Sequence, residues 1–266
     1  MSKPFNKGKL ILLGAGPGDP ELITWKGFRA LRDAKVILYD ALVNPELLKA
    51  ASDSALKISV GKRAGQHSFT QDEINELIVK YVKQEGDVIR LKGGDPYVFG
   101  RGYEEKEYAE LHGIETEYIP GISSAVALTG LQDIPLTRRG INDGFWVITG
   151  TKRNGDLSKD VSLAVQSSAT VVILMGLRKI EEIADLYSKE GRSNYPIAVI
   201  YNGSLPNEKI FVGKISNIVE KMKEDPQTGP GIIVIGEVVK LHPEYVYNFV
   251  NQNFVEQLRE QSYGNK

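Results

Sequence analysis

The stretch LILLGAGPGDPELI, residues Leu10–Ile23, is typical of a strand, a glycine-rich turn and the start of a helix. Its loop lacks the third glycine of a dinucleotide fingerprint, because Asp19 stands there, and it lacks the Gly-Lys-Ser/Thr end of a P-loop. Pro17-Gly18 suits the centre of a type II turn, and Asp19 before Pro20 suits a helix N-cap. An acidic cap disfavours a phosphate at that helix end. The loop is therefore either a strand-to-helix connector or a site for a different ligand.

A second loop repeats this pattern. Gly93 and Gly94 follow the apolar run VIRL and precede Asp95-Pro96. Adjacent glycines let a ligand approach the backbone, and loops at the carboxyl ends of strands form the usual ligand crevice of open α/β sheets. Asp95 either caps a helix or accepts hydrogen bonds from a ligand amine or ribose. Two such loops in one half of the chain favour a neutral or cationic, nucleoside-like ligand.

Short β-rich runs alternate with helical periodicity, which predicts an α/β fold. In the first half we expect strands at 9–13, 36–40, 56–60, 88–91 and 115–119, and helices at 21–33, 71–84 and 103–112. In the second half we expect strands at 145–149, 170–175, 197–201, 210–212 and 231–238, and helices at 178–190 and 215–223. Continuous apolar runs such as TVVILM predict sheets covered on both faces.

The polar, glycine-rich stretch PLTRRGINDG, residues 135–144, is the best candidate for a domain boundary. It divides the chain into an N-terminal α/β domain with the glycine-rich loops over 8–140 and a C-terminal α/β domain over 141–245. A polar tail with scattered aromatic residues follows over 246–266.

The composition excludes several classes of protein. The 266 residues carry a formal net charge of -1, so no global basic field indicates a nucleic-acid partner. Cysteine is absent, which excludes disulfides and thiolate metal sites and fits a reducing cytosol. The three histidines lack metal-ligand spacing, so we expect no metal. The polar N-terminus and the lack of a long apolar run predict a cytoplasmic protein with no membrane partner.

Seven motifs occur in a fixed order along the chain: GAGPGDP, YDALV, GKRAGQHS, QDEIN, RLKGGDPYVFGRG, IPGISSA and PLTRRG. Together they resemble the tetrapyrrole methylase family from Lys9 to Val239. The resemblance implies two α/β domains with the active-site cleft between them, S-adenosylmethionine as methyl donor, S-adenosylhomocysteine as product, and a homodimer. The GKR, QDEIN and GGDPYVFGRG blocks resemble members that methylate uroporphyrinogen III at C2 and C7, which gives precorrin-2 for sirohaem or cobalamin. The chain has no counterpart of the dehydrogenase and ferrochelatase region of fused sirohaem synthases, so we expect one activity.

The resemblance also implies roles for individual residues. The donor site would be lined by Pro17, Gly93, Gly94, Asp95, Val98, Ser123, Ser124, Met175 and Gly203. Asp40 would accept the proton that leaves the methylated ring, and Lys62 would be a proton donor. Without the resemblance, Asp40 is a turn-initiating cap, Lys62 is a solvated charge and Met175 is a core side chain.

Uroporphyrinogen carries eight carboxylates, so a near-neutral protein must gather basic residues locally to bind it. Arginine suits bidentate binding of a carboxylate. The candidates for substrate contact are Lys62, Arg63, Arg101, Arg138, Arg139, Lys152 and Arg153, of which we expect about half to face the cleft. His67 is a weaker candidate, since SFTQDEI has the capping chemistry of a helix start. Arg138 and Thr151 stand where the family commonly has histidine, and both bear on substrate handling.

Three other functions stay open. A later precorrin methylase or a diphthine synthase would keep the donor loops but differ in the GKR and PLT regions. A nicotinamide- or flavin-dependent oxidoreductase is disfavoured by the missing third glycine. A non-catalytic tetrapyrrole carrier would bind the macrocycle without binding S-adenosylmethionine.

Overall fold

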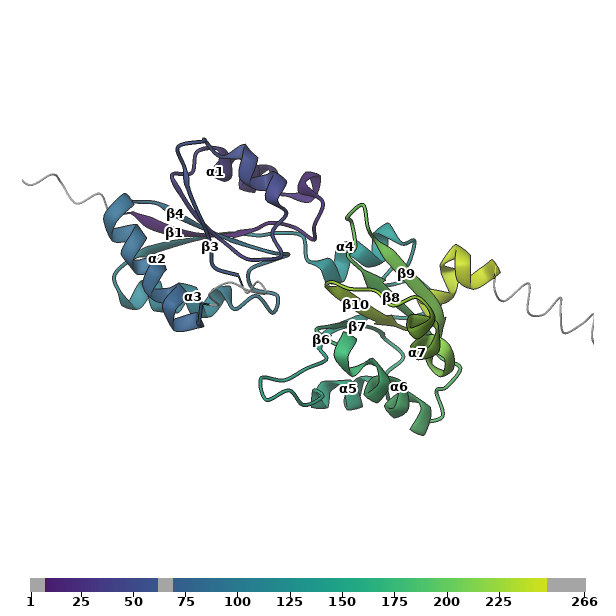
Figure 1. Cartoon of the computed structure of the whole chain (residues 1–266). Helices are drawn as coiled ribbons and strands as arrows, with labels where there is room; N and C mark the ends of the chain where they lie inside the picture. The colour runs from purple at the N-terminus through teal and green to yellow at the C-terminus, as the bar shows by residue number, and fades with distance from the viewer. Residues whose placement is uncertain (1–7, 62–68, 248–266) are drawn as a thin grey trace, which may run out of the picture. The chain divides into compact units, whose positions relative to one another are not determined.

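The computed structural model describes residues 8–61 and 69–247, so Lys62, Arg63 and His67 lie outside the described residues. The chain forms two compact units, the first ending at Ser124 and the second beginning at Ala125 (Figure 1). Each unit has one β-sheet with helices packed against it. This architecture confirms the predicted α/β class.

The first unit contains a five-stranded sheet in the order β3-β2-β4-β1-β5. Its strands are β1 (Lys9–Gly14), β2 (Val36–Tyr39), β3 (Leu56–Ser59), β4 (Val88–Lys92) and β5 (Glu115–Ile119). All the pairings are parallel, so the carboxyl ends of the five strands lie at one edge of the sheet. The predicted strands agree with these bounds to within one residue at each end.

Helices cover both faces of the first sheet (Figure 1). The helical segments are η1 (Pro20–Leu22), α1 (Trp25–Arg32), η2 (Pro45–Ala50), α2 (Gln71–Glu85) and α3 (Gly102–Leu111). Leu10 and Leu12 of β1 pack in one cluster with Ile78 of α2, whereas Ile11 packs in another with Leu31 of α1. Successive residues of a strand point to opposite faces, so continuous apolar strands fill both layers.

The predicted helix over 21–33 is wrong in its first turn. Asp19 accepts a hydrogen bond from the Glu21 N–H at 2.9 Å, but it caps only the short 3-10 turn η1. The backbone then becomes extended at Ile23, and Thr24 starts α1 by accepting a hydrogen bond from the Gly27 N–H at 3.1 Å. The predicted type II turn is also wrong, because Gly18 has a φ of 154° where that turn needs about 80°.

The second unit contains a mixed sheet in the order β6-β7-β10-β8-β9. Its strands are β6 (Phe145–Thr149), β7 (Thr170–Leu174), β8 (Pro196–Tyr201), β9 (Lys209–Lys214) and β10 (Gly231–Ile235). β6 and β7 are parallel, whereas β10 is antiparallel to both β7 and β8, and β8 is antiparallel to β9. The remaining segments are α4 (Ser124–Leu131), α5 (Lys159–Ala164), η3 (Leu177–Lys179), α6 (Ile180–Lys189), α7 (Ile215–Glu224) and η4 (Glu237–Leu241).

The division between the units falls before the composition-based boundary at 140/141. Helix α4 supplies Ala125 and Leu128 to a cluster that also holds Val172 of β7, so α4 packs with the second sheet. The polar stretch after α4 is anchored there too. The Asn142 amide donates to the Gly144 carbonyl at 2.8 Å and to the Thr170 hydroxyl at 3.0 Å. The polar stretch over 135–144 therefore forms an anchored loop within the second unit.

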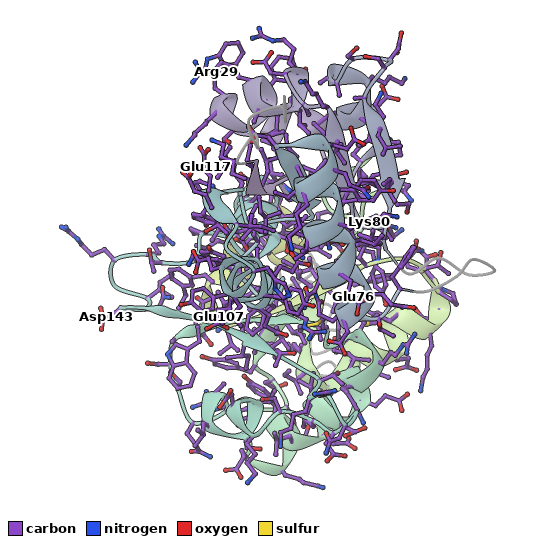
Figure 2. All side chains as sticks on the ribbon, turned by 90° about the vertical axis from the view of Figure 1, so that its left-hand side faces the viewer. Arg29, Glu76, Lys80, Glu107, Glu117 and Asp143 are labelled. Carbon is purple, nitrogen blue, oxygen red and sulfur yellow. The ribbon has the colours of Figure 1, made fainter. Side chains whose placement is uncertain are left out.

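Charged side chains cover the outer faces of α2 and α3. Figure 2 shows Glu76, Lys80 and Glu107 on these helices, and all three are exposed.

Within residues 8–61 and 69–247, no helix combines the length and the apolar character that crossing a bilayer requires.

Candidate functional site

The two glycine-rich loops are hydrogen-bonded to each other. The Gly94 N–H donates to the Gly16 carbonyl at 2.7 Å, and the Gly16 N–H donates to the Gly94 carbonyl at 3.2 Å. The Ala15 N–H also donates to the Lys92 carbonyl at 2.7 Å. The first loop therefore holds the second loop through its backbone, and both extend from the carboxyl ends of adjacent strands.

A third loop, which follows β5, packs against these two without an intervening side chain. A Cβ atom on Gly121 would lie 2.6 Å from the Gly14 Cα atom and would also strike the Gly94 carbonyl. Real Cβ atoms do not approach backbone atoms so closely. The three loops are therefore in direct backbone contact, which requires glycine at positions 14 and 121.

Asp95 links the second and third loops. Its Oδ1 atom accepts a hydrogen bond from the Tyr97 N–H at 2.8 Å. Its Oδ2 atom accepts from the Tyr118 hydroxyl at 2.6 Å and from the Gly121 N–H at 3.1 Å. Burial, together with the hydrogen bond to Asp95, raises the pKa of Tyr118 well above its ordinary value. Of the two roles that the sequence left open for Asp95, the helix cap is wrong, since α3 begins at Gly102 and Asp95 caps a turn instead.

The backbone of Gly94 lies within van der Waals reach of the third loop. Its φ is +65°, and a Cβ atom there would meet nothing nearer than Ser123 Cα and Ser124 N, each at 4.0 Å. The exposed Val98 belongs to the same turn, because its N–H donates to the Asp95 carbonyl at 3.2 Å. The structure thus gathers the predicted donor-site residues of the first unit along one sheet edge: Pro17, Gly93, Gly94, Asp95, Val98, Ser123 and Ser124.

Asp40 lies at the same edge, directly after β2. Its backbone N–H donates to the Leu91 carbonyl at 3.1 Å. Arg90 Nη2 donates a short hydrogen bond to Asp40 Oδ1, and Lys92 Nζ lies 3.6 Å from Asp40 Oδ2. The Asp40 side chain keeps 28% of its surface exposed, whereas those of Arg90 and Lys92 keep 2% and 4%. A carboxylate at the surface therefore rests on two buried cations.

A second carboxylate lies beneath these cations. Glu105 Oε1 accepts hydrogen bonds from Arg90 Nε at 3.1 Å, Lys92 Nζ at 3.0 Å and Gln71 Nε2 at 3.2 Å. Glu105 is fully buried, and its Oε2 atom has no hydrogen-bond partner among the described residues. Burial, with the neighbouring charge of Arg90, lowers the pKa of Lys92. We call Asp40, Arg90, Lys92 and Glu105 the charge cluster.

Sequence reasoning missed three of the four members of the charge cluster. A usable signal existed, because Arg90 and Lys92 occupy alternate positions of a central strand and so share one face. Glu105 likewise stands four residues before the buried Ala109, on the inner face of α3.

The predicted site residues of the second unit also share one sheet edge. Met175 follows β7 and Gly203 follows β8, and these strands run in the same direction because both are antiparallel to β10. Met175 is 53% exposed, so its interpretation as a core side chain is wrong. The Thr151 hydroxyl donates to the Met175 carbonyl at 2.8 Å and thus lies at this edge as well.

Those basic candidates for substrate binding that the structure describes lie in loops. Arg101 is exposed and forms an ion pair of 2.5 Å with Glu104. Arg138 and Arg139 are exposed in the loop that Asn142 anchors, where the Arg138 N–H donates to Asn142 Oδ1 at 2.9 Å. Their exposure leaves them available to an anionic ligand, and their role in binding stays a prediction.

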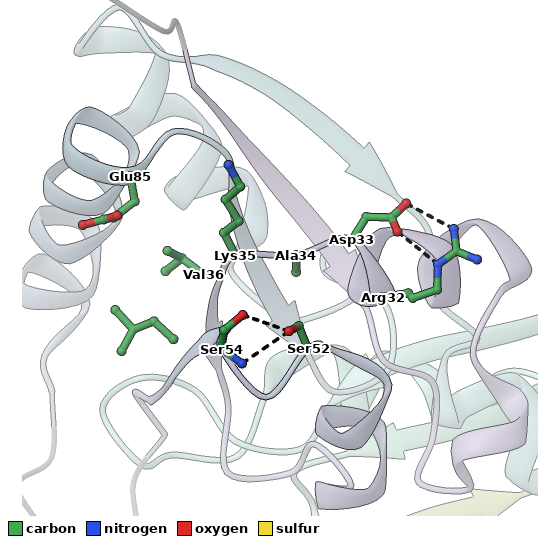
Figure 3. A pocket seen from close by; sticks show the side chains of 9 residues that line it. Arg32, Asp33, Ala34, Lys35, Val36, Ser52, Ser54 and Glu85 are labelled. Atoms are coloured by element: carbon green, nitrogen blue, oxygen red, sulfur yellow. Dashed lines mark hydrogen bonds and ion pairs between the residues drawn. The ribbon is translucent and has the colours of Figure 1, made fainter.

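A cavity of about 490 Å³ opens at the other end of the first sheet (Figure 3). It lies where β2 and β3 begin and α2 ends, and Val36, Leu56 and Glu85 contribute to its lining. The Arg32 side chain there is paired with Asp33 at 3.0 Å (Figure 3). This cavity is remote from the glycine-rich loops, because it lies at the amino ends of the strands.

A known family profile matches most of the chain. The profile of the tetrapyrrole (corrin/porphyrin) methylases matches residues 9–219. The chain belongs to this family.

The curated relatives of the chain include a uroporphyrinogen-III C-methyltransferase and a siroheme synthase. The chain is 46% identical over 236 residues to the uroporphyrinogen-III C-methyltransferase of Methanocaldococcus jannaschii, and the match covers 88% of this chain and 98% of that protein. It is 44% identical to a siroheme synthase of Actinobacillus pleuropneumoniae, where the match covers 90% of this chain but only 49% of the relative. The chain thus spans about half the length of that synthase.

A solved structure shows the same fold. The uroporphyrin-III C-methyltransferase of Thermus thermophilus, complexed with S-adenosylhomocysteine, superposes with a TM-score of 0.76 at 35% identity. The match covers 88% of this chain and all of that structure, so both α/β units are shared.

Proposed function

We propose that this chain is an S-adenosylmethionine-dependent C-methyltransferase. It methylates uroporphyrinogen III at C2 and C7 and so produces precorrin-2 for sirohaem or cobalamin biosynthesis. The observation that carries this proposal is Asp40, a half-buried carboxylate held by two buried cations beside three interlocked glycine-rich loops. The full-length relative from Methanocaldococcus jannaschii and the Thermus structure with the demethylated product support the substrate and the donor.

The residues at the sheet edge fit a nucleoside-like donor. Gly94 has a φ of +65°, which favours glycine, and the absence of a side chain there lets a ligand approach the backbone closely. The exposed Val98 offers an apolar surface beside it, and the Ser123 region offers hydroxyl and backbone groups. When bound, S-adenosylmethionine supplies a methyl group that is already activated by its sulfonium centre. The chain then needs mainly to orient donor and acceptor, which stiff, mutually bonded loops do well.

Asp40 performs the charge chemistry in this proposal. A pyrrole ring that gains a methyl group at carbon develops positive charge and must lose a proton. A carboxylate at the ring stabilises that charge and accepts the proton. Arg90 and Lys92 fix the direction of the Asp40 carboxylate, because each approaches a different oxygen atom.

The proposed function predicts a defined product. Purified full-length protein with labelled S-adenosylmethionine and a panel of reduced tetrapyrroles should turn over uroporphyrinogen III alone, with the mass gain of two methyl groups. Calorimetry should detect binding of S-adenosylhomocysteine. Turnover of a later precorrin in place of uroporphyrinogen III would identify a different family member, and binding of the macrocycle without S-adenosylhomocysteine would identify a carrier.

Substrate affinity should fall as the salt concentration rises. Eight substrate carboxylates meet exposed arginines, and ions screen such contacts beyond about 8 Å at physiological ionic strength. We expect the Michaelis constant for uroporphyrinogen III to increase several-fold between low and high salt, and the double variant Arg138→Gln/Arg139→Gln to reduce that increase. The exposed Lys80→Gln variant on α2 is the control. A salt-independent Michaelis constant would contradict electrostatic binding.

We also propose a homodimer in the cytoplasm. The family resemblance supports the dimer, and the absence of cysteine suits a reducing compartment. Light scattering on the purified full chain tests the assembly, and a monomeric mass would contradict it.

A further inference from the structure

We propose that Glu105 is a positioning residue for methyl transfer, which holds Arg90 and Lys92 in place so that these side chains orient the carboxylate of Asp40. This inference rests on the proposed function, because it assigns Glu105 a task only if Asp40 acts on the reacting ring.

The geometry places Glu105 behind the cations rather than beside the substrate. Arg90 and Lys92 extend from the same face of β4, where two positive charges repel each other. Glu105 Oε1 contacts both, at 3.1 Å and 3.0 Å, so one carboxylate reduces the repulsion and holds the two cations together. A buried cation without such a partner is strongly destabilised.

Burial decreases from Glu105 toward Asp40. The side chain of Glu105 is 0% exposed, those of Arg90 and Lys92 are 2% and 4% exposed, and that of Asp40 is 28% exposed. Only Asp40 among the four therefore reaches solvent to a useful extent. Glu105 cannot touch a ligand at the surface and can act only through the cations.

The unpartnered oxygen of Glu105 argues for an orienting role. An ionised carboxylate can accept about four hydrogen bonds, and buried polar atoms normally have partners. Among the described residues, three side chains donate hydrogen bonds to Glu105, and all three donate to Oε1. The buried Oε2 atom accepts none from these residues. Two of those three donors belong to the side chains that contact Asp40. Glu105 thus orients the side chains of Arg90 and Lys92, although one of its own oxygen atoms is left without a hydrogen bond.

The variant Glu105→Gln tests this inference, because it keeps the shape and removes the charge. We expect the single-turnover rate of methyl transfer to fall about ten- to a hundredfold, as small misplacements of reacting groups do. The affinity for S-adenosylhomocysteine should stay within about twofold, since the hydrogen bonds of Glu105 go to the side chains of Gln71, Arg90 and Lys92 and not to the glycine-rich loops. The control is Glu107→Gln, which changes an exposed glutamate of the same helix and should leave rate and affinity unchanged.

A double-variant cycle separates positioning from mere stabilisation. If Glu105 acts through Asp40, Glu105→Gln should have little further effect on the rate in the Asp40→Asn background. The inference would be overturned if Glu105→Gln lowered the rate by the same factor in the wild-type and Asp40→Asn backgrounds. A wild-type rate for Glu105→Gln would also overturn it. Neither result would affect the proposed function, which fails only if the wild-type protein does not methylate uroporphyrinogen III.

A second variant covers the case in which Glu105→Gln does not fold. Glu105→Asp keeps the charge but withdraws the carboxylate by one methylene group. We expect it to fold and to transfer methyl groups about tenfold more slowly. A wild-type rate in folded Glu105→Asp would show that the position of the carboxylate is unimportant and would overturn the inference.

Discussion

Replacing Asp40 by asparagine is expected to lower the single-turnover rate of methyl transfer at least about a hundredfold. Asparagine keeps an acceptor for Arg90 but has no negative charge to stabilise the methylated ring and no capacity to take its proton. The fold should survive, because Asp40 is partly exposed and Arg90 retains its bond to Glu105. Rapid-quench assays with saturating donor and uroporphyrinogen III measure this rate.

The matched control for this variant is Asp33→Asn. Asp33 lies shortly before β2, whereas Asp40 lies directly after it. Like Asp40, Asp33 is paired with an arginine, but its side chain is exposed. We expect a wild-type rate for Asp33→Asn and unchanged binding of S-adenosylhomocysteine for both variants. If Asp40→Asn transferred methyl groups at the wild-type rate, Asp40 would not be the catalytic carboxylate.

Replacing Gly14 by alanine should disrupt the loops that hold the donor. The new Cβ atom would lie 2.7 Å from the Gly94 carbonyl oxygen and would strike the Gly121 backbone. Backbone atoms cannot yield as a flexible side chain can, so we expect a loss of about 2 kcal/mol or more of unfolding free energy. The melting temperature should fall by at least about 4 °C. Calorimetry should show at least a tenfold loss of affinity for S-adenosylhomocysteine.

Gly113→Ala distinguishes local disruption from general destabilisation. Gly113 has a φ of +72°, lies just before β5 at the amino end of the sheet, and has no atom within 4 Å of its would-be Cβ. Alanine there costs about 1–2 kcal/mol through the left-handed backbone alone. Its binding of S-adenosylhomocysteine should match the wild type. Equal loss of binding in both alanine variants would mean that Gly14 has no special role at the donor loops.

Local pattern predicted the elements well where one physical signal dominated. The continuous apolar runs of β7 and β10 indicated buried strands, and Thr70 with Glu73 forms the capping box that the start of α2 predicted. Helix α4 escaped notice because SAVALTGL is apolar almost throughout and shows no polar face. The antiparallel placement of β10 between β7 and β8 depends on pairing between distant segments, which local sequence does not specify.

The site divides in the same way between what the sequence shows and what only the fold reveals. Gly93, Gly94 and Asp95 stand together in the chain, so their loop was visible in advance. Arg90 and Lys92 looked like polar interruptions of a strand, and Glu105 looked like one of several acidic residues on a solvated helix. Their meaning depends on β2, β4 and α3 meeting at one place, which is a property of the tertiary structure.

The reciprocal hydrogen bonds between Gly16 and Gly94 have a consequence for ligand affinity. A flexible loop loses conformational entropy when it closes on a ligand, and that loss weakens binding. Here the two loops have restricted each other before any ligand arrives, so the ordering cost belongs to the free energy of folding. A donor molecule that enters this edge of the sheet therefore meets preorganised walls, and more of its contact energy appears as affinity.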